Sequence, residues 1–143
     1  MRKSQGFTLI ELMVTIAVLA IVAMMAAPSF QAIVSNQQLQ RSTETLLQEI
    51  KVARTEAILN RQTVSLNLNS STTNTYGNVN WLPAGDVRLK TPANNRLTFN
   101  PSGVLTSNFK EIELCKTAGR SASKKITLTT FGQIEKIEEG SCT

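Results

Sequence analysis

The sequence predicts an α+β fold in which one long N-terminal helix packs on a small β-rich head. Three patterns carry this prediction: an apolar run near the N-terminus, an amphipathic stretch with helical spacing directly after it, and two-residue alternation beyond Arg61. The chain has 143 residues, enough for one domain of ordinary size. We therefore expect a single head carried by a helix.

The apolar run covers residues 7–27, in which one glutamate and two threonines are the only residues that are not apolar. As a helix, at about 1.5 Å per residue, it would span roughly the hydrocarbon core of a bilayer. Arg2 and Lys3 precede it, like the positively charged start of an export signal. These features predict a leader over residues 1–6 and a transmembrane half of the helix over residues 7–27.

Two residues distinguish this run from an ordinary membrane anchor. Gly6 comes before the run, so cleavage after it would leave the apolar segment on the mature protein with Phe7 first; an uncleaved anchor is the alternative. Glu11 lies inside the run, where a carboxylate costs about 2.5–3.5 kcal/mol. Its partner would be the new amine of Phe7, either in the same chain, where it is about one helical turn away, or in a neighbouring subunit. Pairing with the neighbour would fix the axial stagger of the two helices, because any other stagger leaves the charges buried alone.

Residues 28–61 predict the amphipathic half of the same helix. Pro28 lacks an amide hydrogen and clashes with the carbonyl four residues back, so we expect a kink there. Apolar residues then recur at three- and four-residue steps as far as Ile58. This face is expected to pack on the head.

Residues 62–143 predict the head, with about six short strands. Strands are expected over residues 63–69, 87–90, 96–99, 109–115, 125–131 and 133–137. The polar stretch 69–80 reads as a loop, Trp81 and Leu82 as an anchor on the core, and residues 116–125 as a basic loop.

The cysteine and histidine content limits the chemistry of the chain. Cys115 and Cys142 are its two cysteines, and it has no histidine. An exported chain meets an oxidising compartment, which favours a disulfide over two free buried thiols. A zinc site and a histidine general base are disfavoured. The S-x-x-K match at residues 121–124 lacks the partner motifs of its enzyme class. We expect a protein that is not an enzyme and has no cofactor or metal.

A cluster of four cations occupies residues 116–125. Lys116, Arg120, Lys124 and Lys125 lie there with no acidic residue among them. Such a loop could contact the phosphates of DNA, in a salt-sensitive way, or could be a solvated loop. The net charge is +5, or +3 without residues 1–6, and this weak bias does not by itself indicate a nucleic-acid partner.

Residues 6–12, Gly-Phe-Thr-Leu-Ile-Glu-Leu, resemble the type III signal of type IV pilins and type II secretion pseudopilins. The resemblance implies that a prepilin peptidase cleaves after Gly6 and methylates the amine of Phe7. It also implies that Glu11 sets subunit register in a filament and that Pro28 is the helix-kinking proline. The implied partners are other pilin subunits, the peptidase and the bacterial inner membrane, with the head in the periplasm before the subunit enters the filament.

The second half of the chain resembles the GspH/FimT family of minor pilins and pseudopilins. The resemblance rests on residues 97–103, Leu-Thr-Phe-Asn-Pro-Ser-Gly, and on the pattern of Cys115, Gly119-Arg120, Gly132 and Cys142. It implies the pilin fold, in which a long N-terminal helix packs on a small antiparallel β head of two sheets. It also implies a minor pilin of a type IV pilus that starts assembly or occupies the tip. A GspH-like pseudopilin of a type II secretion system is the first alternative.

A DNA-binding minor pilin for natural transformation is the second alternative, and an unrelated single-span protein is the third. Some FimT-like pilins contact DNA through a C-terminal G-R-x-R motif. The matching place here is Gly132-Gln133-Ile134-Glu135, in which both arginines are missing and one is replaced by an acid.

Overall fold

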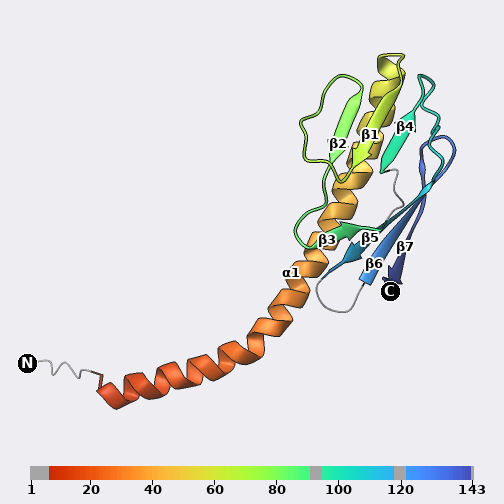
Figure 1. The fold of residues 1–143 in the computed structure, drawn as a ribbon. Coiled ribbons are helices and arrows are strands. Elements are labelled where there is room, and N and C mark those ends of the chain that lie inside the picture. Colours follow the sequence, from red (N-terminus) through yellow and green to blue (C-terminus); the bar gives the residue numbers. More distant parts are fainter. Residues whose placement is uncertain (1–6, 91–94, 118–121, 143) are drawn as a thin grey trace, which may run out of the picture. The chain divides into compact units, whose positions relative to one another are not determined.

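The computed structural model describes residues 7–90, 95–117 and 122–142, apart from the side chains of residues 25–29. One helix, α1 (Leu9–Leu59), is followed by seven strands. The chain forms two compact units, residues 1–34 and residues 35–143. The helix runs through both as a single element, so the predicted α+β fold of one long helix and a β-rich head is confirmed (Figure 1).

The first unit contains the start of α1 and the residues with the strongest sequence signals. The predicted leader with Gly6 lies outside the described residues, and so does the side chain of Pro28, whose backbone is part of α1. Among the helical residues that the structure describes, none forms a stretch long and apolar enough to cross a membrane. The transmembrane segment predicted over residues 7–27 includes residues 25–27, whose side chains are not described.

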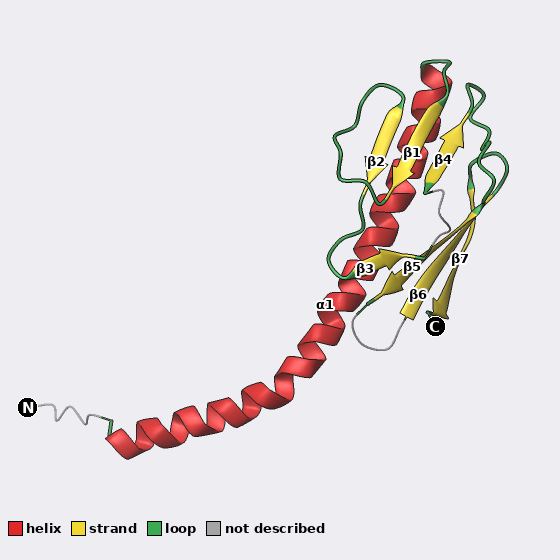
Figure 2. Ribbon diagram, in the orientation of Figure 1, coloured by secondary structure: helices red, strands yellow, loops and turns green. Residues whose placement is uncertain are grey.

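The head holds two sheets (Figure 2). The three-stranded sheet has the order β2-β1-β4 and consists of β1 (Val64–Leu68), β2 (Asn78–Trp81) and β4 (Arg96–Phe99). The four-stranded sheet has the order β3-β5-β6-β7 and consists of β3 (Val87–Leu89), β5 (Glu111–Lys116), β6 (Ala122–Leu128) and β7 (Ile134–Ser141). Two sheets were predicted, and two are present.

One strand pair departs from the predicted antiparallel arrangement. β1 and β2 pair in parallel, with Ser65 opposite Asn78 and Leu68 opposite Trp81. The connection between them carries the chain back to the start of β1, where the Ser65 amide donates to the carbonyl oxygen of Gly77 at 2.9 Å. β2 then runs in the same direction as β1. The other pairs in both sheets are antiparallel.

The core lies between the second half of α1 and the inner faces of both sheets. Residues at three- and four-residue steps on the helix are fully buried, namely Leu46, Ile50, Ala53 and Ala57. The sheets contribute alternating buried residues, among them Val64, Leu66, Leu97, Phe99, Ile112, Leu114, Ile126 and Leu128. The helical and strand periodicities in the sequence meet in this one cluster.

Trp81 and Leu82 were predicted to anchor the chain together, and only Trp81 does so. Its side chain is 4% exposed, and its Nε1 donates to Thr45 Oγ1 of α1 at 3.0 Å. Leu82 follows the strand and is exposed. β2 itself lies mostly inside the stretch predicted as a loop, because its outward residues are asparagines that hid the alternation of Val79 and Trp81.

The basic loop predicted over residues 116–125 is shorter than expected. Lys116 is the last residue of β5, and β6 begins at Ala122, so half of the predicted loop belongs to the strands. Lysines at inward and outward positions interrupt the apolar pattern of β6. That interruption explains why periodicity alone placed the start of the strand three residues late, at Lys125.

Gly132 makes the turn between β6 and β7 and allows a close approach to the core. Its φ is +67°, and a Cβ built there would lie 2.6 Å from Cε1 of Phe99, which is fully buried. We expect Gly132→Ala to lower the free energy of unfolding by about 2–4 kcal/mol, combining left-handed backbone strain with overpacking. Urea denaturation of the full chain in a mild detergent measures the loss.

Gly140→Ala is the matched control for this substitution. Gly140 lies in β7 and has no left-handed φ, and the nearest atom to a built Cβ is the rotatable Ser123 Oγ. A loss below about 1 kcal/mol is expected there. Equal losses for the two variants would contradict the role assigned to Gly132.

Candidate functional site

The start of α1 is fixed by a threonine cap. The Thr8 carbonyl oxygen accepts the amide hydrogen of Leu12 at 3.2 Å, and its Oγ1 accepts the amide hydrogen of Glu11 at 3.3 Å. Thr8 is therefore the residue before the first helical turn, and Thr8-x-x-Glu11 has the spacing of a capping box. The same spacing is visible in the sequence and could have located the start of the helix, which the apolar run alone placed too early.

The cap changes the expected relation between Phe7 and Glu11. We predicted that both lie in one helix, about one turn apart. Because the helix begins at Leu9, Phe7 lies before the cap and outside the helix. Glu11 lies in the first turn, where its negative charge interacts favourably with the helix dipole. The carboxylate thus has a local role in addition to any partner.

The surface of α1 from Leu9 to Met24 is exposed and apolar on all sides. Large apolar side chains there are more than half exposed, namely Leu9, Ile10, Leu12, Met13, Val14, Ile16, Val18, Leu19, Ile21, Val22 and Met24, and Phe7 before them is 80% exposed. Glu11 is exposed among them. A helix that is apolar all round is stable only when lipid or other helices cover it, so this segment needs partners that the isolated chain does not supply.

The predicted basic cluster does not form one surface in the described residues. Lys116 is buried, and its Nζ donates to Asn36 Oδ1 at 2.8 Å. Lys124 also turns inward, and its Nζ donates to Gln40 Oε1. Lys125 points to the opposite face of β6, and Arg120 lies outside the described residues. Two of the cations therefore hold the sheet to α1 instead of facing solvent together.

Lys125 forms an ion pair on the outer face of the four-stranded sheet. Its Nζ lies 2.8 Å from Glu111 Oε2, and this hydrogen bond raises the pKa of Lys125 above its usual value of 10.5. A raised lysine pKa stabilises the fold below about pH 10.5, and the contribution is lost as the pH rises through the raised value. The ammonium is therefore charged and paired throughout the neutral range.

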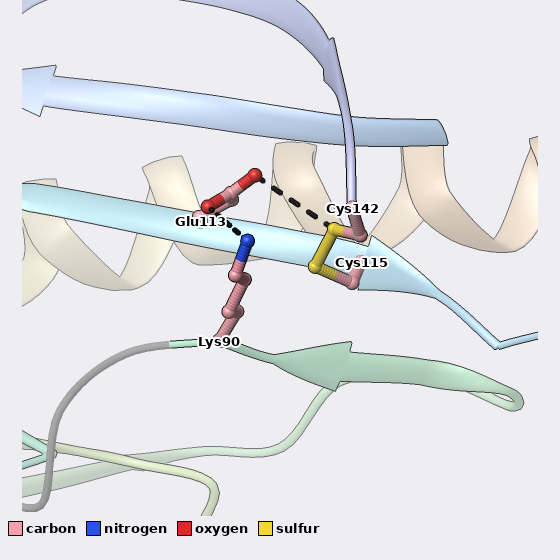
Figure 3. Close-up of a disulfide and its surroundings, with 4 residues drawn as sticks. All are labelled: Lys90, Glu113, Cys115 and Cys142. Atoms are coloured by element: carbon pink, nitrogen blue, oxygen red, sulfur yellow. Dashed lines mark hydrogen bonds and ion pairs between the residues drawn. A yellow bond between two sulfur atoms is a disulfide. The ribbon is translucent and has the colours of Figure 1, made fainter. Parts of the chain in front are cut away.

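The predicted cysteine pair is a disulfide. Cys115 at the end of β5 and Cys142 after β7 are bonded, with their Cα atoms 6.0 Å apart. Figure 3 shows Glu113 beside the bond, with its Oε1 3.7 Å from Cys142 Sγ and its Oε2 3.6 Å from Lys90 Nζ. A disulfide sulfur carries no hydrogen, so the sulfur contact is one of packing, whereas the lysine contact is an ion pair. The bond ties the C-terminal end of the sheet to β5.

Comparisons with known proteins agree with these features. The family profile of the prokaryotic N-terminal methylation motif matches residues 1–27, and that of the type II transport protein GspH matches residues 42–132. The second match covers more than half of the chain. The chain belongs to the GspH family. Its members are pilin-like subunits, and the methylation motif at the start of this one is that of type IV pilins.

Relatives of this GspH-family subunit include pilins. A type IV major alpha-pilin of Moraxella bovis is 31% identical over 140 residues, covering 98% of this chain and 84% of the pilin. The crystal structure of the type IV minor pilin FimU of Pseudomonas aeruginosa is similar in fold, with a TM-score of 0.51 and 20% identity over 76% of this chain and 97% of FimU. A second crystal form of FimU gives the same TM-score.

Family membership indicates which kinds of partner cover the apolar start of α1. Pilins and pseudopilins assemble with other pilin subunits, and a type IV pilin motif implies a protein that is anchored in a membrane and incorporated into a filament. This GspH-family subunit carries the required exposed apolar surface and one carboxylate within it. At the place compared with a G-R-x-R motif in the sequence, the chain makes the tight turn at Gly132, with Gln133 and Glu135 where that motif has arginines.

Proposed function

We propose that this GspH-family subunit is a minor pilin of a type IV pilus. It is made as a prepilin, held in the inner membrane by residues 7–27 with its head in the periplasm, cleaved after Gly6, and methylated on Phe7. The helix then enters the filament, where the subunit starts assembly or occupies the tip. The observation that carries the proposal is the exposed apolar surface of α1 next to a matched methylation motif.

The geometry at the cap supports the cleavage step. Phe7 lies before α1, which begins at Leu9, and Thr8 is the cap whose carbonyl oxygen accepts the first helical hydrogen bond, from the Leu12 amide. A peptidase binds its substrate as extended backbone, and helical residues before the cap would hide the bond to be cut. Thr8 therefore leaves Phe7 presented in a form that the peptidase can accept.

Glu11 supports the assembly step. After cleavage the amine of Phe7 is a cation, and Glu11 is the one acidic residue within residues 7–27. In a bundle of such helices, the carboxylate of one subunit and the amine of its neighbour are each buried, so only the stagger that pairs them avoids two unpaired charges. Since Phe7 lies outside the helix of its own chain, no helical spacing holds its amine at a fixed distance from Glu11 of the same chain.

A pseudopilin of a type II secretion system is the second candidate, because the matching family profile carries the name of a type II transport protein. The pilin of Moraxella bovis, which matches along nearly the whole chain, favours the pilus. The two can be separated in the native bacterium. A pilus subunit is detected in pili sheared from the cell surface, whereas loss of a pseudopilin abolishes secretion of exported enzymes and leaves pili intact.

Processing is tested by mass spectrometry of the protein purified from its native membrane. We expect the mature N-terminus to be a methylated Phe7, and Gly6→Val to leave the precursor uncleaved because a bulky residue does not fit beside the scissile bond. Ser4→Val is the matched control within the leader and should be cleaved normally. A chain that keeps residues 1–6, or one with an unmethylated first residue, would contradict the proposal.

A further inference from the structure

A polar hollow lies on the head beside the free edge of β4. It has a volume of about 580 Å³, within the range of small-ligand sites, and is lined by β1, β4 and residues 106–109. Its lining includes Asn95, Arg96, Ser107, Asn108 and Phe109. These residues have no role in the proposed filament function, and they lie far in the chain from the start of α1.

The hollow contains polar atoms that lack partners. Asn95 Oδ1 and Ser107 Oγ are buried and have no hydrogen-bond partner within the described ranges. Buried polar groups are normally paired, so two orphans in one lining need an explanation. Both atoms are covered in this structure, so the Asn95 amide and the Ser107 hydroxyl must rotate about their side-chain torsions to reach a ligand in the hollow. A ligand with hydroxyl groups would give each atom a partner.

The edge of β4 adds backbone groups to the hollow. The Leu68 amide donates to the Asn95 carbonyl oxygen at 2.7 Å, so Leu68 and Asn95 form a hydrogen-bonded pair of the antiparallel ladder. Because such pairs alternate with non-hydrogen-bonded pairs, the next pair, Asn67 and Arg96, shares no backbone hydrogen bonds. The amide and carbonyl of Arg96 therefore point away from β1, along the free edge. The next acceptor on this edge, the Thr98 carbonyl oxygen, is already taken by the amide of Thr106 at 2.8 Å. Within the described residues this leaves Arg96 as the open part of the edge, which is too short to pair with a peptide strand.

The side chains narrow the ligand class further. Arg96 Nε donates to Asn67 Oδ1 at 2.9 Å, which holds the guanidinium over the hollow and leaves its terminal nitrogens as donors. The lining residues that the structure describes include no carboxylate or thiol, which argues against a metal ion. They include one cation, which is too few for a phosphate chain. Phe109 is half-buried against the core and also lines the hollow. Amides, a guanidinium and an aromatic face suit a ligand with many hydroxyls and an apolar ring face.

We infer that this hollow binds a carbohydrate, one sugar unit of which lies between the edge of β4 and residues 106–109. Arg96 and Asn108 donate to vicinal hydroxyl groups, Asn95 and Ser107 complete the polar contacts, and Phe109 packs on the C–H face of the ring. The single guanidinium of Arg96 can donate hydrogen bonds to the hydroxyls of a neutral sugar or to the carboxylate of a uronic acid. This binding is separate from filament assembly and would give the head a ligand outside the pilus.

The test uses the full chain in a detergent without a sugar headgroup, because glycoside detergents would compete. Saturation-transfer NMR and calorimetric titration are run with the methyl glycosides of glucose, galactose, N-acetylglucosamine and glucuronic acid, and with an acetylated Gly-Ser peptide. At least one glycoside is expected to bind with a dissociation constant of about 1–10 mM or tighter. If only the glucuronide binds, the Arg96 guanidinium contacts the carboxylate of the sugar. If a neutral glycoside binds, the guanidinium contacts sugar hydroxyls.

Two variants locate the binding, and a third is the control. Arg96→Gln and Asn108→Ala should each weaken it about tenfold, as expected for a lost charged or bidentate hydrogen bond. Arg88→Gln removes the same charge from the outer face of the other sheet and should leave the affinity within about twofold. An unchanged thermal midpoint shows that each variant is folded. The inference is overturned if no glycoside binds, if the peptide binds instead, or if Arg88→Gln and Arg96→Gln have equal effects.

Discussion

Replacing Glu11 by Ala is expected to lower incorporation of the subunit into filaments about a hundredfold or more, while cleavage after Gly6 continues. The variant would leave the amine of a neighbouring Phe7 buried without its carboxylate, and removal of one partner from a buried pair costs roughly 3–5 kcal/mol. Immunodetection of the chain in sheared pili, normalised to the amount in the membrane, measures the effect.

The cap at Thr8 provides the control that separates two roles of Glu11. Thr8→Ala removes the hydroxyl that accepts the Glu11 amide and should cost about 1 kcal/mol of local helix stability. It keeps the carboxylate, so incorporation should fall far less than with Glu11→Ala. Glu44→Ala removes a carboxylate from the exposed face of the same helix and should have no effect. If Thr8→Ala and Glu11→Ala are equally defective, the carboxylate acts as part of the cap and the register hypothesis is wrong.

Removing the disulfide is expected to lower the free energy of unfolding by about 3–4 kcal/mol. Cys115 and Cys142 are 27 residues apart, and the loop-closure estimate for a loop of that size gives this value. Cys115→Ser/Cys142→Ser is preferred to a single substitution because it leaves no free thiol to form bonds between chains. The change in urea midpoint measures the loss, and reduction of the unsubstituted chain should reproduce it.

The part of the head that loses stability when the disulfide is removed can be located as well. The side chains of β7 are largely exposed, so this strand is held mainly by its pairing with β6 and by the disulfide that follows it. We expect amide hydrogen exchange to accelerate first in β7, with β5 and β6 protected until global unfolding. Uniform acceleration through both sheets would show that the disulfide stabilises the head as a whole.

The elements that were predicted correctly have strong periodicity. The helix as far as Leu59 and the strands at Val64–Leu68 and Arg96–Phe99 follow apolar spacings of 3.6 and 2 residues, which are local properties. β2 was missed because asparagines occupy its outward positions. The parallel pairing of β1 and β2 depends on the path of the connection between them, which no spacing reveals.

The same distinction applies to the candidate sites. The disulfide could be predicted from two cysteines and an export signal, since both are properties of composition. The basic cluster was misjudged because residues that are adjacent in a strand point to opposite faces: Lys124 faces Gln40 of α1 while Lys125 faces Glu111. The hollow beside β4 gave no sequence signal, since it is formed by Asn67, Arg96 and Ser107, which meet only in three dimensions.

β7 has a consequence for a protein that works in a crowded array of identical or related heads. It is the outermost strand of its sheet and eight residues long, so it offers a row of unpaired backbone groups to any neighbouring chain. Glu135, Lys136, Glu138 and Glu139 place charges along it, and Gly140 offers no side chain to pack. These residues make pairing between two such edges unfavourable, which would confine subunit association to the helices and keep the heads from aggregating through their sheets.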